Sequence, residues 1–348
     1  MSIYENDLYL QDLRNVAGLD LPWQQLQGKS IVISGATGMI GSFLIDVLME
    51  KDLDLTVYAL GRNAEKAKAR FARWWTDAHF RFVQCDINAG IPLEGNVDYV
   101  FHAASNTHPV AYATDPIGTI TTNIIGTDHL LRFAADHGAS RMLFASSVEV
   151  YGENRGDVET FTEDYCGYLN CNTLRAGYPE SKRCGEALCQ AYIKQRGLDV
   201  VIPRLARTYG PTMLMSDTKA LSQFLKKGIA GEDIVLKSEG TQLFSYTYVA
   251  DAVSAVLYCL LLGECGVAYN IADSASDIRL RDLAAIIANA AGRKVVFDLP
   301  DETERAGYST ATKAIMESEK IRALGWKAMY TMQTGLERTL NILKEEKE

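Results

Sequence analysis

The first half of the chain alternates short apolar runs with longer segments of helical periodicity. Ser30–Ser34 is an apolar run of this kind, and such runs are typical of buried parallel strands, because both faces of these strands are covered. The alternation predicts a parallel sheet with helices on both faces, an α/β doubly wound fold. Further strands are expected at Leu55–Leu60, Phe80–Gln84, Val97–His102, Arg141–Ser146 and Val200–Arg204, and helices at Met39–Lys51, Ala64–Thr76, Ile117–Asp136 and Tyr178–Arg196.

The second half of the chain is less regular. Its mixture of patterns predicts a smaller mixed α/β lobe, with a cleft between the lobe and the sheet. We expect an N-terminal helical extension at 1–29, a main domain at 30–205 to which the chain returns near 241–273, and the smaller lobe at 206–240 and 274–348. The helical patterns lie at Lys219–Ala230, Asp251–Leu262, Arg281–Ala291 and Met332–Lys344, and the strand candidates at Ile234–Leu236, Phe244–Val249, Ala268–Ile271 and Lys294–Phe297.

Length and composition narrow the class of protein. A chain of 348 residues suits two lobes, and its apolar and charged fractions of 47% and 23% argue against a disordered or fibrous protein. The net charge is −9 and no basic stripe is present. Nucleic acids and anionic membrane surfaces are therefore not expected as partners.

Cysteine usage and the start of the chain bear on its location. The seven cysteines include no Cys-x-x-Cys pair and have no histidine at zinc spacing. The first residues mix acids with apolar side chains, unlike a signal peptide, and the longest apolar stretch, around Ala252–Leu262, is too short to cross a membrane. We therefore expect free thiols, no metal site and a cytoplasmic protein.

A glycine-rich loop joins the first strand to the first helix. In Gly35-Ala-Thr-Gly38-Met-Ile-Gly41 the first glycine permits a tight turn, the second lets the backbone approach a pyrophosphate, and the third lets the helix pack on the sheet. The N–H groups at the start of the helix favour phosphate. The loop therefore predicts a dinucleotide site. Its candidate residues are Gly35, Thr37, Gly38, Met39, Ile40 and Gly41.

Three further residues bear on which dinucleotide binds. Gly61 occupies the place at the end of the second strand where an acid would hold the ribose 2′-hydroxyl, and Arg62 follows it. A guanidinium without a carboxylate suits a 2′-phosphate, so the pattern favours NADP over NAD, with both left open. Asp86, followed by Ile87, comes after the third strand and could accept a hydrogen bond from the adenine amino group or cap the strand.

The candidate catalytic groups are a serine, a tyrosine and a lysine. Tyr178 and Lys182 are four residues apart and therefore lie on one face of a helix. The lysine ammonium would lower the tyrosine pKa, so that the phenolate can take a proton from a substrate hydroxyl while hydride leaves for the nicotinamide. Ser147 follows the strand at Arg141, where its hydroxyl can reach the same oxygen; Ser146 is the weaker candidate.

Small and polar residues next to the fourth strand complete the expected site. His102, Ala103 and Ala104 end that strand and are expected against the cofactor. Asn123 in the following helix could bridge water and backbone near the lysine, or serve the fold alone. Ser105 is expected to contact the substrate.

Taken together, these motifs resemble those of the extended short-chain dehydrogenases/reductases. GATGMIG, FHAAS, the Asn-Ile-Ile-Gly-Thr run at 123–127, SSVEVYG and YPESK carry the resemblance, which covers about residues 30–345. Within that group the chain is similar to nucleotide-sugar epimerases, dehydratases and decarboxylases, and closest in pattern to UDP-glucuronate decarboxylases. The resemblance implies a Rossmann domain with a substrate-binding lobe. It also implies oxidation at C4 of the sugar with later return of the hydride, and homodimers that pair the helices at 117–136 and 178–196.

Glu149 stands where dehydratases and decarboxylases place a glutamate within reach of C5. A carboxylate there could remove the C5 proton once C4 is a ketone, or it could be an acid bound to a backbone amide at the strand end. The preceding residue is Val148, where dehydratases usually carry Asp or Ser. This difference weakens the specific case for water elimination.

Two residues depart from the family pattern on the substrate side. Arg207 replaces the family's phosphate-contacting asparagine in the segment that starts at Arg204, and Phe244 stands where the family often has an arginine that clamps a diphosphate or a carboxylate. Arg207 could restore the lost charge from the other side, and Arg204 and Arg207 are both expected to bind substrate. Without that arginine a glucuronate carboxylate would lack its partner, which argues against a true glucuronate decarboxylase.

The leading hypothesis is a nucleotide-sugar epimerase or dehydratase that keeps its cofactor through the cycle. An NADPH-dependent ketone or 4-keto-sugar reductase is the alternative, favoured by Gly61, Arg62 and Phe244. A non-catalytic redox sensor that binds NADP belongs to a third class, but it would have little use for an intact serine–tyrosine–lysine set.

Overall fold

The computed structural model describes residues 2–107, 109–298 and 312–347. Its larger sheet is built from eight strands: β1 (Ser30–Ser34), β2 (Thr56–Gly61), β3 (Phe80–Gln84), β4 (Tyr99–His102), β5 (Arg141–Phe144), β6 (Ser146–Ser147), β7 (Val200–Leu205) and β11 (Ala268–Ile271). They follow the order β11-β7-β5-β4-β1-β2-β3, with β6 beside β7, and every pairing is parallel. The order reverses between β1 and β4, which is where ligands bind in such sheets.

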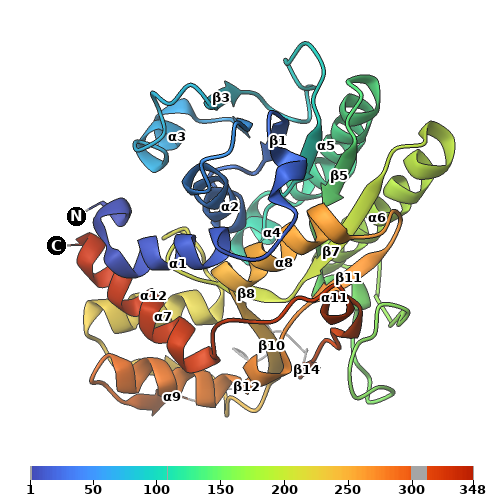
Figure 1. The fold of residues 1–348 in the computed structure, drawn as a ribbon. Helices are drawn as coiled ribbons and strands as arrows, with labels where there is room; N and C mark the ends of the chain where they lie inside the picture. Colours follow the sequence, from blue (N-terminus) through green and yellow to red (C-terminus); the bar gives the residue numbers. More distant parts are fainter. Residues whose placement is uncertain (1, 108, 299–311, 348) are drawn as a thin grey trace.

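Helices cover both faces of this sheet (Figure 1). The alternation of side chains along β1 explains why, because Ile31 and Ile33 enter one apolar cluster and Val32 enters the other. The first cluster includes residues of α2 (Met39–Glu50) and α8 (Val249–Leu262), and the second includes residues of α5 (Pro116–Asp136) and α6 (Gly177–Arg196). The expected Rossmann-like α/β class is therefore confirmed.

One helix of the sheet domain is shorter than expected. The pattern predicts a helix over Ala64–Thr76, but α3 spans Ala64–Arg70. The backbone leaves the helical conformation at Phe71, whose ring is fully buried, and Trp74 then directs its indole N–H to Asp46 at 2.8 Å. Burial of these two rings decides the end of the helix.

The smaller lobe contains a mixed sheet and a helical layer. In the sheet, β10 (Leu243–Tyr248) pairs in parallel with β8 (Arg207–Tyr209) and β14 (Lys313–Ala314), and antiparallel with β12 (Asp277–Arg279). The strand at 243–248 thus belongs to this lobe, whereas β11 returns to the larger sheet; residues 299–311 of the expected lobe lie outside the described residues. The other elements are β9 (Ile234–Leu236), which pairs with β13 (Val295–Phe297), α7 (Ala220–Ala230), η5 (Ser274–Ser276), α9 (Leu280–Ala290), α11 (Glu319–Ala323) and α12 (Met332–Lys347).

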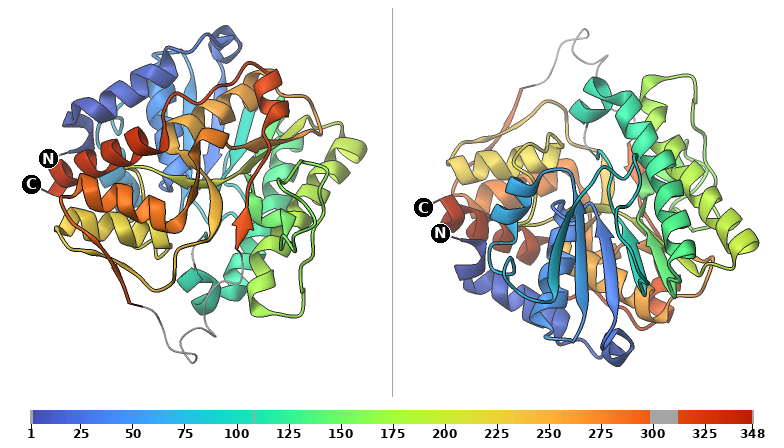
Figure 2. Two further views of the ribbon diagram at one scale, coloured as in Figure 1. Left: turned by 90° about the horizontal axis from the view of Figure 1, so that it is seen from below. Right: turned by 90° about the horizontal axis from the view of Figure 1, so that it is seen from above.

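The N-terminal extension consists of η1 (Ile3–Glu5), α1 (Asp7–Ala17) and η2 (Trp23–Leu26). Buried polar contacts attach it to both lobes. Tyr9 donates a hydrogen bond to Asp46 of α2, while Asp12 pairs with Arg338 of α12 at 2.7 Å and accepts from Tyr248 of β10 at 2.6 Å. Figure 2 shows α1 beside α12, with the two chain ends close together. The extension is thus part of the folded body.

Three findings concern the cysteines, possible membrane spans and possible metal ligands. All seven cysteines are free thiols. Within the described ranges, no helix is long and apolar enough to cross a membrane. The same residues contain no group of three or more His, Cys, Asp or Glu side chains that could hold a metal ion.

Candidate active site

The glycine loop wraps the start of α2 at the carboxyl edge of β1. Gly35 has φ +70°, and a Cβ at this position would lie 2.7 Å from the backbone of Ala103 and Ala104. A Cβ on Gly41 would collide with the carbonyl oxygen of Gly35, so only glycine lets the helix approach this closely. Gly38 is the N-cap of α2 and has no side-chain cap. The N-cap therefore supplies no side-chain acceptor for the first N–H groups of α2. Thr37 lies in the loop, and Met39 and Ile40 lie in the first turn of the helix. This cradle fits a dinucleotide pyrophosphate.

Two buried polar residues lie behind this cradle. The ring of His102 is held between Ser34 at 2.8 Å and Thr127 at 3.0 Å, and burial together with Lys182 lowers the pKa of His102 well below its usual value. His102 thus serves as a neutral structural link. Asn123 is fully buried and donates to Ser181 at 2.9 Å, but its Oδ1 has no partner. A buried amide oxygen without a donor indicates a place for water or ligand.

The residues expected around the adenosine lie at the ends of β2 and β3. Arg62 is exposed; its carbonyl oxygen accepts a hydrogen bond from Gln84 at 3.1 Å, but its guanidinium makes no hydrogen bond or ion pair with the described residues. A Cβ on Gly61 would lie 3.2 Å from the ring of Phe82, which leaves little room for a carboxylate side chain. Asp86 is exposed and accepts a hydrogen bond from the backbone of Asn88 at 3.0 Å, and Ile87 is buried.

The structure brings Ser147 and Tyr178 together. β6 carries Ser147 past the end of β5, and Tyr178 stands in the first turn of α6. Burial raises the pKa of the Tyr178 hydroxyl to about 12, while a hydrogen bond from Ser147 lowers it. Ser146 is turned away, because its hydroxyl donates to Glu186 at 2.5 Å. Of the two serines, only Ser147 has its hydroxyl within hydrogen-bond reach of Tyr178.

Lys182 lies one helical turn further along α6 and is 2% exposed. Its ammonium donates to the carbonyl oxygen of Ala145 at 2.8 Å and lies 4.8 Å from the centre of the Phe144 ring. Burial lowers the pKa of Lys182 to about 8. The groups that shift the pKa of Tyr178 are Ser147, Glu149 and Arg175 rather than this lysine. A buried ammonium needs an acceptor, and the Ala145 carbonyl supplies it.

Glu149 belongs to a cluster that pattern analysis did not anticipate. Glu149, in η3 (Val148–Tyr151), forms an ion pair with Arg175 of η4 (Leu174–Ala176) at 2.8 Å. The Arg175 guanidinium lies 5.2 Å from the centre of the Tyr112 ring, and Tyr112, in α4 (Pro109–Thr114), stacks on Tyr178 at 5.1 Å. Arg175 adjoins Tyr178 in sequence, but Tyr112 lies in a stretch that carries no local signal. Through Tyr112, the cluster is in contact with the candidate catalytic tyrosine.

Of the residues expected to bind substrate, Arg204 makes several contacts within the protein. Its guanidinium pairs with Glu186 at 2.6 Å and also donates to Tyr151 at 2.9 Å and to the carbonyl oxygen of Glu163 at 2.7 Å. These internal acceptors engage the guanidinium, and a contact between Arg204 and substrate stays a prediction. The hydroxyl of Ser105 donates to the neighbouring carbonyl of Asn106 at 3.1 Å. Arg207 differs, because one of its nitrogens is buried without a partner.

Comparisons with known proteins show the family to which the chain belongs. The model of the NAD dependent epimerase/dehydratase family matches residues 31–272. UDP-glucuronic acid decarboxylase 1 of Xenopus tropicalis is 31% identical over 326 residues, which cover 92% of this chain and 73% of the relative. The crystal structure of a dTDP-glucose 4,6-dehydratase from Streptomyces venezuelae with NAD bound has a TM-score of 0.77 at 24% identity and covers 91% of this chain and 97% of its own. UDP-glucuronic acid 4-epimerase from Bacillus cereus, in complex with UDP-glucuronic acid and NAD, has a TM-score of 0.75 at 21% identity over 91% and 99% of the two chains. The chain therefore belongs to the NAD dependent epimerase/dehydratase family of the extended short-chain dehydrogenases/reductases.

Proposed function

We propose that this protein is a nucleotide-sugar epimerase or dehydratase that works by transient oxidation at C4 of the sugar. The observation that carries the proposal is the convergence of Ser147 and Tyr178, with Lys182 behind them, at the same sheet edge as the glycine loop. The glycine loop, Ala103 and Ala104 would hold NAD(P), which would supply the acceptor for the C4 hydride and its later return. The amide of Asn123 donates to Ser181 of α6 and leaves its oxygen available for a water or ligand.

The residues of the chain divide the proton chemistry between them. Tyr178 takes the proton of the C4 hydroxyl, and Ser147 holds the same oxygen by a hydrogen bond. The guanidinium of Arg175 favours the phenolate, while the ammonium of Lys182 is held by the carbonyl oxygen of Ala145. Glu149, held by Arg175, is the candidate base for C5, because its carboxylate borders the position of Tyr178. A carboxylate held in one orientation by an ion pair is suited to remove a proton made acidic by a neighbouring ketone.

The experiment that tests this proposal combines cofactor analysis with turnover. Purified protein is denatured and the released dinucleotide identified by absorbance and mass, and native protein is incubated with UDP-glucuronic acid, UDP-glucose or dTDP-glucose while products are followed by NMR. UDP-glucuronic acid comes first, because the relatives are UDP-glucuronic acid decarboxylases. We expect conversion of a nucleotide sugar without net oxidation or reduction of cofactor, and loss of conversion in Tyr178→Phe. Absence of turnover with bound cofactor present would refute the proposal.

An NADPH-dependent keto-sugar reductase is the second candidate function. The ring of Phe82 against Gly61 and the free guanidinium of Arg62 support a 2′-phosphate and therefore NADP. The relevant measurement is the Kd for NADP and NAD in the wild type and in Arg62→Ser. A wild-type preference for NADP that disappears in Arg62→Ser, together with net NADPH consumption, would favour the reductase. Equal loss of both affinities would contradict the role given to Arg62.

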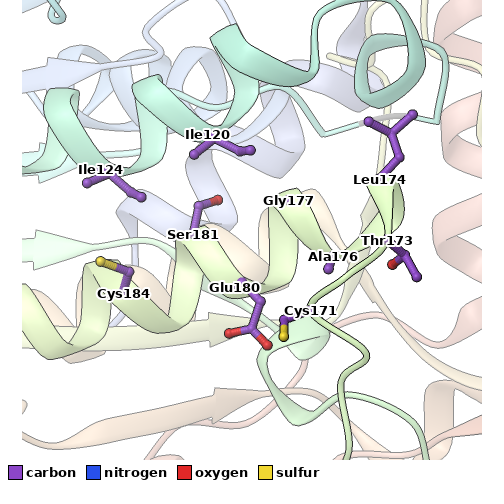
Figure 3. Close-up of a pocket in the computed structure, with 10 residues that line it drawn as sticks. All are labelled: Ile120, Ile124, Cys171, Thr173, Leu174, Ala176, Gly177, Glu180, Ser181 and Cys184. Carbon is purple, nitrogen blue, oxygen red and sulfur yellow. The ribbon is translucent and has the colours of Figure 1, made fainter.

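We further propose that two copies of the chain pair through α5 and α6. Apolar side chains are exposed along this face, with Ile117 76% and Leu174 63% accessible. A hollow of about 450 Å³ lies between the same elements, lined by Ile120, Ile124 and Leu174 among others (Figure 3). Exposed apolar patches of this kind mark association surfaces. Light scattering should give twice the 38.4 kDa chain mass; Ile120→Glu should halve that value, and the exposed control Leu262→Glu should leave it unchanged.

A further inference from the structure

The N-terminal extension links the smaller lobe to the helix that follows the glycine loop. Its helix α1 packs on α2 and α8 of the sheet domain and on α12 of the smaller lobe (Figure 2). Tyr9 and Asp12 are neighbours on the surface of α1, because side chains three residues apart lie on the same side of a helix. Tyr9 donates to Asp46 of α2, whereas Asp12 is held by the smaller lobe. One side of α1 therefore holds elements of both lobes.

The attachment of the extension to the smaller lobe is a buried charge pair. The Asp12 carboxylate is fully buried, pairs with Arg338 of α12 at 2.7 Å and accepts a hydrogen bond from Tyr248 of β10 at 2.6 Å. Arg338 also donates to the carbonyl oxygen of Leu8 at 2.7 Å, so it contacts both the side chain and the backbone of the extension. A desolvated carboxylate is costly without its partner, and this cost keeps α1 and α12 together.

Two further contacts lie at opposite ends of α1. Asn6, the N-cap of this helix, donates to Glu345 at 2.6 Å, and Asn15 near its end donates to the hydroxyl of Tyr330 at 2.8 Å. The segment at Tyr330 is itself fixed, because its backbone N–H donates to Asp251 of α8 at 3.2 Å. Contacts spread along the whole helix oppose a rotation of the smaller lobe about any one of them.

The smaller lobe also reaches the glycine loop directly. Thr212, in the loop that follows β8, is nearly buried, and its hydroxyl donates to the carbonyl oxygen of Met39 at 2.9 Å. Met39 is the first residue of α2, and Asp46 lies about two turns further along the same helix. The smaller lobe thus holds the first turn of α2, while the extension holds its middle. A lobe released from the extension would be free to move away from that first turn.

We infer that the N-terminal extension, anchored through Asp12, retains the bound dinucleotide by keeping the smaller lobe closed on the first turn of α2. The inference rests on the proposed function and deepens it, because transient oxidation at C4 needs the same dinucleotide to take up the hydride and to return it. Asp12 is a positioning residue in this arrangement, since it acts through Arg338 and Thr212 rather than on the dinucleotide itself. Opening of the lobe would expose the cradle at Gly38 and speed dissociation.

The test measures how fast dinucleotide leaves the full-length protein. The protein is loaded with NADH or NADPH, whichever binds more tightly, and release is followed by fluorescence after addition of excess oxidised dinucleotide. Asp12→Ala should raise the release rate constant by about 10-fold or more, because loss of the buried pair shifts the lobe toward the open state. Thr212→Val, which keeps the shape and removes the donor, should raise it several-fold. Leu283→Ala is the control: it removes a fully buried side chain of α9, remote from the extension, and should lower stability without changing release.

Two more measurements separate lobe closure from a general loss of structure. Once the lobe is open, Thr212 no longer reaches Met39, so Thr212→Val should add little to the effect of Asp12→Ala. Hydrogen exchange in the first turn of α2 should accelerate in Asp12→Ala and stay unchanged in Leu283→Ala. If Asp12→Ala does not fold, Tyr248→Phe carries the test, because it keeps both charges and removes only the hydroxyl that donates to Asp12; its release should be faster than in wild type.

The inference would be overturned by wild-type release in Asp12→Ala or Tyr248→Phe, by equal acceleration in Asp12→Ala and Leu283→Ala, or by effects of Asp12→Ala and Thr212→Val that simply multiply. Faster release from Asp12→Ala, in a protein whose wild type converts no nucleotide sugar, would refute the proposed function and leave this role of the extension standing. Wild-type release from Asp12→Ala, together with turnover, would do the reverse.

Discussion

Replacement of Arg70 by methionine tests how the N-terminal extension is held to the sheet domain. The carboxylate of Asp46 on α2 is fully buried and pairs with Arg70 at 2.5 Å. It also accepts hydrogen bonds from Tyr4 and Trp74, each at 2.8 Å, and from Tyr9. The arginine is the only positive charge among these partners. Without it, neutral donors alone remain around a buried negative charge.

The expected loss of stability depends on whether one member of the buried ion pair is removed or both are replaced. Removal of one member of a buried ion pair costs about 3–5 kcal/mol, because the other charge stays desolvated. At roughly 2–4 °C per kcal/mol, the melting temperature should fall by about 6–20 °C. The double variant Arg70→Met with Asp46→Leu removes both charges and should be less destabilised than the single variant.

Thermal and urea unfolding followed by circular dichroism would measure these differences. Arg73→Met is a matched control, because Arg73 pairs with Glu50 of the same helix α2 while remaining 34% exposed; such pairs contribute about 0–1 kcal/mol. The reasoning would be refuted if Arg70→Met and Arg73→Met lost similar stability, or if the double variant were worse than Arg70→Met alone.

Three further predictions concern the candidate site. Tyr178→Phe should lower kcat by about 10²–10⁴-fold, as expected for loss of a general base, while the bound dinucleotide measured after denaturation stays unchanged; a drop in content would point to a structural role. Gly41→Ala should abolish dinucleotide binding in a fluorescence titration, because the added methyl meets the Gly35 carbonyl; normal affinity would contradict the close packing of the loop. Burial lowers the pKa of Lys182 from 10.5 to about 8, so between these values the unfolded chain binds more protons and the free energy of unfolding rises with pH. Urea midpoints from pH 8 to 10 should show this rise in wild type relative to Lys182→Met, and identical slopes would exclude it.

Much of the fold could be predicted from the sequence, because its signals are local. The bounds of β1, β3, β9 and β11 match the apolar runs, and β-strand periodicity needs only a few residues to become visible. The glycines of the loop were identifiable for the same reason: Gly35 and Gly41 stand at fixed spacing between a strand and a helix. Tyr178 and Lys182 share a helix face through their spacing alone.

The tertiary structure decided which residues of distant segments pair with one another. Only the fold shows that Glu186 occupies Arg204, that Tyr112 stacks on Tyr178, and that Phe244 carries Arg207. Each pair joins residues that are close only because particular strands and helices become neighbours. The local pattern of apolar and polar residues carries no information about which elements these are. The sequence by itself therefore determined many of the elements, the glycine loop and the spacing of the candidate catalytic residues, while long-range packing determined which charged side chains have partners within the described residues.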